Sequence, residues 1–190
     1  NTLFYILKNR LICNLLNTEL KKNYLFKKKK VKNLNFYKKI LKEKKFDLII
    51  NCDNKNVISK EFLSKKILKN YNSSAYTTLV KHKKINNNKA IQIFTKNGPI
   101  AFLPISEFET SIVFSKLDSQ NEFDLKELQT IIHNYKLRFK IKSISEINKF
   151  PLYFSLARKY HKKNVMAFGD ILHRIHPHAG QGFNMTVRDI

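Results

Sequence analysis

The chain has 190 residues, 43% of them hydrophobic and 12% aromatic, which is enough for a globular core in one or two domains and excludes a disordered chain. The net charge of +23 is typical of nucleic-acid or anionic-membrane binding. However, 32 of the 37 basic residues are lysines spread along the chain and only five are arginines, so we expect no nucleic-acid partner and only weak attraction to anionic lipid headgroups. Two cysteines, Cys13 and Cys52, exclude a disulfide scaffold, and we expect two buried thiols in a reducing compartment.

The first 45 residues predict a helix followed by short strands. Leucines recur every fourth residue from Leu3 to Leu15, which predicts an amphipathic helix. Residues 21–45 are rich in lysine and predict short strands with charged connections. No apolar run approaches the roughly 20 residues that span a bilayer, and charged residues interrupt the apolar start of the chain, so we expect neither a signal peptide nor a membrane anchor.

A strand and a helix are predicted next. The apolar run 46–52 indicates a buried strand of a parallel sheet. Asp53 follows it directly, at the position where strands of α/β folds present ligand-binding groups. Without a partner motif, an aspartate there is about as often a helix N-cap. Residues 56–71 then show helical spacing through Ile58 and Ile67.

From about Tyr71 the pattern changes to that of an antiparallel sheet. Short segments rich in Ile, Val, Phe, Thr and Tyr alternate with turn-forming clusters, and they span residues 74–84, 89–96, 100–106 and 111–117. Residues 124–139 predict a helix with Asp124 as its N-cap and with Leu125, Leu128, Ile131 and Ile132 facing inward. Residues 150–160 and 164–168 predict two further strands.

This order of elements predicts an α/β (α+β) fold with two interleaved domains. One is part of a Rossmann-like domain, built from residues 1–70 and 162–190. The other is an antiparallel sheet built from residues 71–161.

The final segment concentrates the glycines. Three of the four in the chain lie between Gly169 and Gly182. A strand over residues 165–170 would end in Asp170, whose carboxylate can accept hydrogen bonds from ligand hydroxyls. The turn 179–182 leads into a helical pattern, so free amides and the positive end of the helix dipole would face an anion or a polarised carbonyl. Such a site suits a cofactor that becomes negative, such as a reduced flavin.

The same segment carries His173, His176 and His178, whose spacing leaves a zinc site open as an alternative. No cysteine lies nearby and no supporting carboxylate is identifiable in the sequence. We therefore favour the cofactor over the metal, and expect no metal site.

The segment GDILHRIHPHAGQGFNMTVRD, residues 169–189, resembles the second flavin-binding motif of flavoprotein aromatic hydroxylases of the p-hydroxybenzoate-hydroxylase fold, GD-x-x-H-x-x-x-P-x-x-GQG-x-N-x-x-x-RD. Its H-P-x-A-G-Q-G form is most like that of the hydroxylases of ubiquinone biosynthesis. Residues 98–115 resemble the sheet segment of that family around G-P-x-A-x-L-P-L. Residues 46–63 stand where the family has its Asp-Gly motif, D-G-x-x-S-x-x-R.

The resemblance implies an FAD-dependent monooxygenase that uses NAD(P)H and O2 to hydroxylate a polyprenyl-phenol. It implies that residues 1–70 and 162–190 bind FAD and that residues 71–161 bind the substrate. It further implies peripheral association with the inner membrane face, a cytoplasmic location and a ubiquinone-synthesis protein complex. The cofactor-binding positions carried over are Asp53, Asp170, Pro177, Gly180, Gln181, Gly182, Phe183 and Asn184. No side chain is assigned as a catalytic acid or base, because the cofactor performs the difficult step.

Three departures from the family pattern accompany this resemblance. The G-x-G-x-x-G fingerprint is absent from the sequence, so we expect a fragment that starts after it and lacks the ADP half of the FAD site. In the Asp-Gly motif Asn54, Val57 and Lys60 replace Gly, Ser and Arg; asparagine tolerates a positive φ, so we expect the turn to survive. Ile171 and Leu172 replace two small residues, which changes local packing.

Two other interpretations stay open at this point. One is a basic module on a flavoprotein scaffold that binds nucleic acid or an anionic membrane. The other is an inactive remnant of the enzyme, and the altered Asp-Gly motif favours it.

Overall fold

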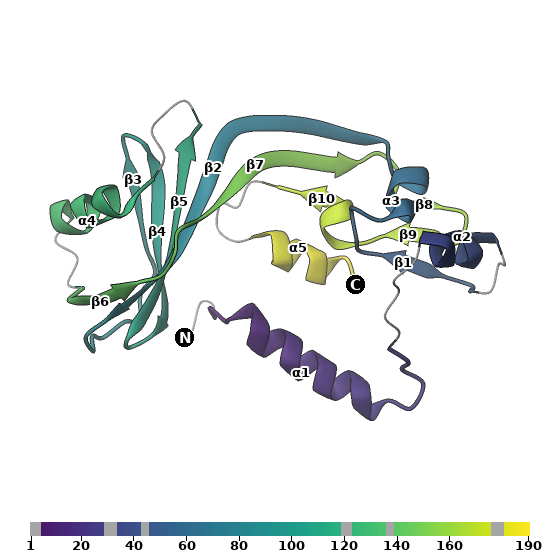
Figure 1. Cartoon of the computed structure of the whole chain (residues 1–190), viewed down its shortest axis with the longest axis horizontal. Coiled ribbons are helices and arrows are strands. Elements are labelled where there is room, and N and C mark those ends of the chain that lie inside the picture. Colours follow the sequence, from purple (N-terminus) through teal and green to yellow (C-terminus); the bar gives the residue numbers. More distant parts are fainter. Residues whose placement is uncertain (1–4, 29–33, 43–45, 119–122, 136–138, 176–180) are drawn as a thin grey trace. The chain divides into compact units, whose positions relative to one another are not determined.

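The computed structural model describes residues 5–28, 34–42, 46–118, 123–135, 139–175 and 181–190 (Figure 1). The chain forms two compact units that alternate along the sequence. Unit 1 contains residues 1–28 and 72–151, and unit 2 contains residues 29–71 and 152–190. Two long strands, β2 (Lys66–His82) and β7 (Asn148–Ala157), contribute to both units. The mixture of helices with a large antiparallel sheet confirms the predicted fold class. Residues 1–28 belong to unit 1, together with the antiparallel sheet.

Unit 1 is built on an antiparallel sheet. Its strands are β2, β3 (Ile91–Thr95), β4 (Gly98–Ser106), β5 (Glu109–Leu117) and β6 (Ile141–Ile144), hydrogen-bonded in the order β3-β4-β5-β2-β6. Phe114 of β5 lies opposite Tyr76 of β2 and Ile100 of β4. Buried and partly exposed residues alternate along β5, as expected of a strand with one face in the core. The sheet predicted from residue 71 onward is confirmed.

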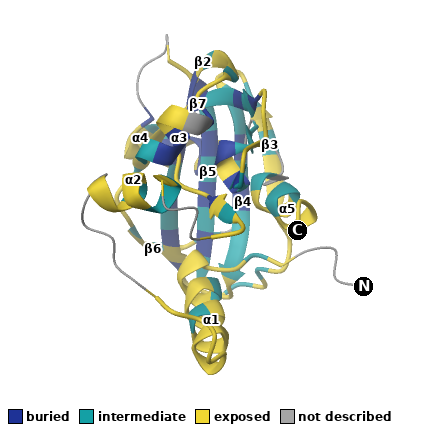
Figure 2. Ribbon diagram, turned by 90° about the vertical axis from the view of Figure 1, so that its right-hand side faces the viewer, coloured by how far each residue is buried: buried dark blue, intermediate teal, exposed yellow. Residues whose placement is uncertain are grey.

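One helix covers the buried face of this sheet. α4 (Leu125–Asn134) begins at the predicted N-cap Asp124, whose carboxylate accepts a hydrogen bond from the Glu127 N–H at 2.8 Å. The core joins α4 to the sheet through Tyr76, Val80, Ile100, Phe102, Ile112, Phe114, Phe123, Leu128, Ile131 and Ile132 (dark blue in Figure 2). Leu125 was predicted to face inward, but it lies in the first turn and is 47% exposed. The helix also ends at Asn134, earlier than predicted.

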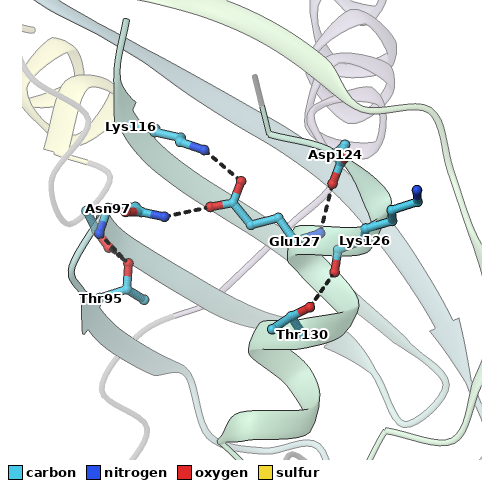
Figure 3. Close-up of polar contacts among 8 residues, drawn as sticks. Thr95, Asn97, Lys116, Asp124, Lys126, Glu127 and Thr130 are labelled. Carbon is cyan, nitrogen blue, oxygen red and sulfur yellow. Dashed lines mark hydrogen bonds and ion pairs between the residues drawn. The ribbon is translucent and has the colours of Figure 1, made fainter. Parts of the chain in front are cut away.

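An ion pair ties α4 to β5 beside this core. Lys116 lies on the buried face of β5, and its Nζ is 2.7 Å from Oε2 of Glu127 on α4. The amide of Asn97 donates to the other carboxylate oxygen of Glu127 at 3.0 Å (Figure 3). Helix, strand and the β3–β4 turn are therefore joined through one carboxylate.

The first helix, α1 (Asn9–Lys22), confirms the predicted amphipathic helix but begins later than Leu3. None of its residues is buried. Lys8, just before the helix, forms an ion pair of 2.5 Å with Glu109 of β5. No helix within the described ranges is long and apolar enough to cross a membrane.

Unit 2 contains a small sheet in the order β1-β9-β8. β1 (Ile49–Asn51) pairs in parallel with β9 (Val165–Ala167), and β8 (His161–Lys162) pairs antiparallel with β9. The parallel strand predicted in residues 46–52 is thus confirmed, but only Asn51 of β1 is buried. Ile50 is 53% exposed, so the prediction of a fully buried strand was wrong.

Two further sequence predictions in this part of the chain are corrected. Residues 34–42 form a helix, α2 (Leu34–Lys42), and not short strands, since their apolar positions follow a helical period. α3 (Val57–Phe62) ends before Ile67, which lies in β2. The reason is that the Lys65 carbonyl accepts a long-range hydrogen bond from the Arg158 N–H at 2.9 Å, and this pairing extends the chain.

The last elements of unit 2 carry the glycine-rich segment. They are the 3₁₀ turn η1 (Gly169–Ile171), the short strand β10 (His173–Arg174) and the helix α5 (Gln181–Arg188). β10 pairs antiparallel with β7. The helical pattern predicted after residue 182 is confirmed, and the helix already includes Gln181 and Gly182.

Candidate functional site

The carboxyl ends of β1 and β9 lie next to each other at one edge of the small sheet. Asn51 and Ala167 are paired in register, and the Phe168 N–H donates to the Asn51 carbonyl at 3.0 Å. Asp53 and Asp170 each follow one of these two strand ends. This edge is where α/β sheets place their ligand sites.

Asp53 begins a turn held by hydrogen bonds. Its carboxylate accepts the Lys55 N–H at 2.8 Å, and its carbonyl accepts the Ser59 hydroxyl at 2.5 Å. The N-cap of α3 is Asn56, whose side chain accepts the Ser59 N–H at 2.9 Å, so Asp53 is not the cap. Asn51, which is buried, donates to the Ser59 hydroxyl at 2.8 Å. Sequence reasoning missed this network, although an asparagine before an apolar run such as Val57–Ile58 indicates a cap.

The altered Asp-Gly turn does not need a positive φ at Asn54. Among the described residues other than glycine, only Asn72 and Lys163 have a positive φ. The Asn54 side chain accepts a hydrogen bond from Lys66 Nζ. Partial burial lowers the pKa of Lys66, because desolvation disfavours the charged ammonium.

Asp170 lies in a turn and not in a strand. β9 ends at Ala167, and Gly169 follows with φ +66°, a conformation that glycine adopts without strain. The strand therefore ends three residues earlier than predicted. The side chain of Asp170 is exposed, and within the described part of the chain no donor is hydrogen-bonded to its carboxylate. It is available to a ligand.

The two bulky residues after Asp170 belong to the core of unit 2. Ile171 is fully buried and packs with Leu63 and Ala167, with Leu172 against them. Burying an isoleucine side chain stabilises a fold by about 1.5–3 kcal/mol. Ile171 and Leu172, which replace the two small residues of the family motif, therefore hold in place the turn that contains Asp170.

A histidine–aspartate pair connects β10 to the end of α5. His173 Nε2 lies 2.7 Å from the Asp189 carboxylate. The other ring nitrogen, Nδ1, is buried and has no hydrogen-bond partner among the residues that the structure describes. His176 and His178 of the alternative zinc site lie outside the described residues. Within the described ranges, no group of three metal-ligating side chains occurs.

Helix α5 packs beside η1, with Thr186 in its last turn as the nearest residue to Gly169. A Cβ added to Gly169 would lie 3.8 Å from Thr186 Cγ2 of α5. In the first turn of α5, Gln181 begins the helix, Phe183 is 62% exposed and Asn184 is exposed. Pro177 and Gly180 lie outside the described residues.

These features fit a flat ligand with polar edges. A Cβ added to Gly182 would have no atom within 4 Å, so a ring can approach the backbone there. The exposed Asp170 carboxylate offers an acceptor for hydroxyl groups. The buried Nδ1 of His173 lacks the partner that buried polar atoms normally have. The residues present are therefore compatible with a flavin and its ribityl chain.

The prediction that both cysteines are buried was wrong. Cys13 and Cys52 are both exposed thiols. Partial burial nevertheless raises the pKa of Cys52, which directly follows β1.

The fold is that of a flavoprotein, as comparisons with known proteins show. The sequence profile of the FAD binding domain family matches residues 47–190. The chain therefore belongs to the FAD binding domain family, which confirms the resemblance found from the sequence.

Relatives include hydroxylases of ubiquinone biosynthesis. The chain is 32% identical over 104 residues to the 3-demethoxyubiquinol 3-hydroxylase of Escherichia coli (strain K12), a match that covers 52% of this chain and 27% of that protein. It is 27% identical over 184 residues to the mitochondrial ubiquinone biosynthesis monooxygenase COQ6 of Danio rerio, a match that covers 75% of this chain and 38% of that protein. The chain thus spans well under half the length of these relatives.

Solved structures share the fold. A flavin-dependent halogenase from Xanthomonas campestris matches with a TM-score of 0.56 at 13% identity, covering 75% of this chain and 29% of that one. CabE, an aromatic hydroxylase from angucycline biosynthesis, matches with a TM-score of 0.51 at 15% identity, and the match covers 75% of this chain and 30% of CabE. At these identities the similarity concerns the fold.

Proposed function

We propose that this chain is part of an FAD-dependent monooxygenase that hydroxylates the ring of a polyprenyl-phenol in ubiquinone biosynthesis, with NAD(P)H and O2 as co-substrates. The observation that carries the proposal is the exposed carboxylate of Asp170 in η1, which packs against α5, in a chain of the FAD binding domain family. The names of the relatives support the substrate class.

The residues of this chain would bind and orient FAD. Asp170 would accept hydrogen bonds from the ribityl hydroxyls, and Asp53 lies at the neighbouring strand end. Gly182 leaves room for the ring, and the N–H groups at the start of α5 would face its electron-rich edge. Pro177 and Gly180 would shape the loop before α5, Gln181 would begin the helix, and Phe183 and Asn184 would flank the ring.

When bound, FAD supplies the redox and oxygen-transfer chemistry. The contribution of the chain is to hold the ring, to exclude water from it and to place the substrate. No side chain of the candidate site is assigned as a general acid or base.

The substitution Asp170→Ala tests the cofactor site. It removes a charge-assisted contact worth roughly 1.5–3 kcal/mol, so the Kd for FAD should rise about 10- to 150-fold. Flavin absorbance and fluorescence titration of the purified full-length gene product measure this. Glu61→Ala, which removes an exposed carboxylate of α3, is the matched control and should leave the Kd unchanged. A protein that stays colourless and indifferent to FAD would refute the proposal.

Two other functions give different results. A basic module for nucleic acid or anionic lipid, which the charge of +23 favours, would lose affinity by decades between low and moderate salt. A flat salt response excludes it. An inactive remnant would bind FAD without oxidising NAD(P)H in the presence of a phenolic substrate.

The substrate and its pathway also suggest partners. A polyprenyl-phenol is lipid-soluble, so we propose a soluble, cytoplasmic enzyme that associates peripherally with the inner membrane face and with a complex of ubiquinone-synthesis proteins. Co-sedimentation with vesicles that contain anionic lipid, at low and at moderate salt, tests the membrane association.

A further inference from the structure

A pocket at one end of the unit 1 sheet carries more positive than negative charge. Its volume of about 430 Å³ lies within the range of about 300–1,000 Å³ that is usual for small-molecule sites. Its walls come from β2, β4, β5, β6 and the residue before α1, all within unit 1. Its charged lining residues are Lys8, Lys81, Lys142 and Glu109. None of the lining residues belongs to the candidate flavin site.

A shift in strand register brings Lys142 into this pocket. Lys81 of β2 is paired with Ser143 of β6, whereas the next residue, His82, is paired with Ile141. Lys142 is therefore the extra residue on β6. In a regular ladder its side chain would point to the face opposite that of Ser143 and Lys81. A bulge re-aims such a side chain, which explains why Lys81 and Lys142 line the same pocket.

Two of the three lysines have no carboxylate partner. Oε2 of Glu109 lies 2.5 Å from Nζ of Lys8, so these two charges compensate each other. Within the described residues, no carboxylate lies within ion-pair distance of Lys81 or Lys142. The two uncompensated ammonium groups repel each other, and an anion bound between them would be attracted by both.

The turn between β4 and β5 adds a hydroxyl group and an aromatic ring. A second register shift, between Pro104 and Ser106, lies directly before this turn. The Ser106 hydroxyl accepts a hydrogen bond from the Phe108 N–H at 3.2 Å, and its own hydrogen has no acceptor in the described part of the chain. The Phe108 ring is 50% exposed. This wall therefore offers one hydrogen-bond donor and an apolar surface.

His82 fixes the end of β2 at the pocket. It is fully buried, and its two ring nitrogens are hydrogen-bonded with the Lys83 carbonyl at 2.8 Å and the Thr110 hydroxyl at 2.9 Å. Both nitrogens are thus already engaged, so the groups available to a ligand are the ammonium groups and the Ser106 hydroxyl.

We propose that this pocket binds a phosphate group, either of a soluble phosphate ester or of a phospholipid headgroup. A phosphate monoester carries about −1.5 to −2 charges and three acceptor oxygens. It can therefore accept hydrogen bonds from Lys81, Lys142 and the Ser106 hydroxyl together, and lysine commonly binds phosphate as a point charge. An apolar group on the phosphate would pack against Phe108. The site goes beyond the proposed function and does not depend on it.

Isothermal titration calorimetry of the purified full-length protein with phenyl phosphate, at neutral pH and low ionic strength, tests this. Lys81→Met and Lys142→Met should each raise the Kd about two- to fivefold, because each removes one exposed ion pair with the phosphate. The double variant should raise the Kd by roughly the product of the two effects. Lys126→Met, which removes an exposed lysine of α4 outside the pocket, is the matched control and should leave the Kd unchanged.

Glu109→Gln gives a change of the opposite sign. It removes the negative charge from the pocket, so phenyl phosphate should bind about twofold more tightly. A variant that merely damaged the fold would bind more weakly. Benzoate, which has the same ring but a single negative charge, should bind roughly threefold more weakly than phenyl phosphate to the wild-type protein.

Co-sedimentation with vesicles that contain phosphatidic acid distinguishes the two sources of the phosphate. If the double variant loses vesicle binding together with phenyl phosphate binding, the ligand is a phospholipid headgroup. If it loses only phenyl phosphate binding, the ligand is a soluble ester.

Three results overturn the inference. They are a wild-type protein that does not bind phenyl phosphate, a double variant with the Kd of the wild type, and equal affinity of the wild type for benzoate, which would indicate a general anion site. These measurements need no flavin. A protein that fails to bind FAD therefore contradicts the proposed function and leaves this inference unaffected.

Discussion

Removing the carboxylate of Glu127 should destabilise unit 1 much more than removing the ammonium group of Lys116. The Lys116 side chain is only 4% exposed, whereas that of Glu127 is 21% exposed. In Glu127→Ala the lysine stays on the buried face of β5 without its ion-pair partner (Figure 3). Leaving such a charge uncompensated costs about 3–5 kcal/mol, and the partial exposure of the pair places the cost near 3 kcal/mol.

The reverse substitution leaves a milder defect. Lys116→Met keeps the apolar stem in the core, and Glu127 keeps its hydrogen bond from Asn97 and its contact with water. We expect a cost of about 1 kcal/mol. The double variant, Lys116→Met with Glu127→Ala, should therefore be about 2 kcal/mol more stable than Glu127→Ala alone, because no buried charge remains.

Urea unfolding followed by circular dichroism measures all three free energies of unfolding. Lys126→Met, on the exposed side of α4, is the matched control and should change stability by less than about 0.5 kcal/mol. If the two single substitutions cost the same, or if their costs add in the double variant, the reasoning about the buried charge is refuted.

Two further predictions concern the glycines and the thiols. Gly98→Ala should lower the free energy of unfolding by about 3 kcal/mol or more, because the new Cβ would lie 2.0 Å from the Ser115 carbonyl oxygen and Gly98 has φ +134°. Gly182→Ala is the control, because a Cβ added there has no atom within 4 Å. Equal urea midpoints for the two variants would contradict this prediction. Cys52 should react with iodoacetamide more slowly than Cys13 at pH 8, because its raised pKa leaves less thiolate. Mass spectrometry of native and urea-unfolded protein measures this, and a faster Cys52 in the native protein would disprove it.

Much of unit 1 could be predicted because its signals are local. The alternation of apolar and polar residues around Ile112 and Phe114 follows the period of a strand with one buried face. Asp124 caps α4 because its side chain reaches an N–H only three residues away. The match of residues 169–189 to a flavin motif likewise needed no tertiary information.

Predictions that depended on distant partners were less accurate. Residues 34–42 carry a helical pattern that the density of lysines obscured. Ile67 follows a helical spacing, yet a hydrogen bond from Arg158 extends the chain just before it. Cys13 and Cys52 are apolar by type but exposed, because burial depends on what packs against a residue.

The sequence by itself determined the family, the antiparallel sheet and the presence of a carboxylate, Asp170, in a flavin-type motif, since these follow from short-range spacing and residue type. Tertiary structure decided that Gly169 turns the chain out of β9, and that His173 meets Asp189 and Arg174 meets Tyr153. Such contacts join residues about 16 to 21 positions apart, and only the pairing of strands and the packing of α5 beside η1 bring them within reach.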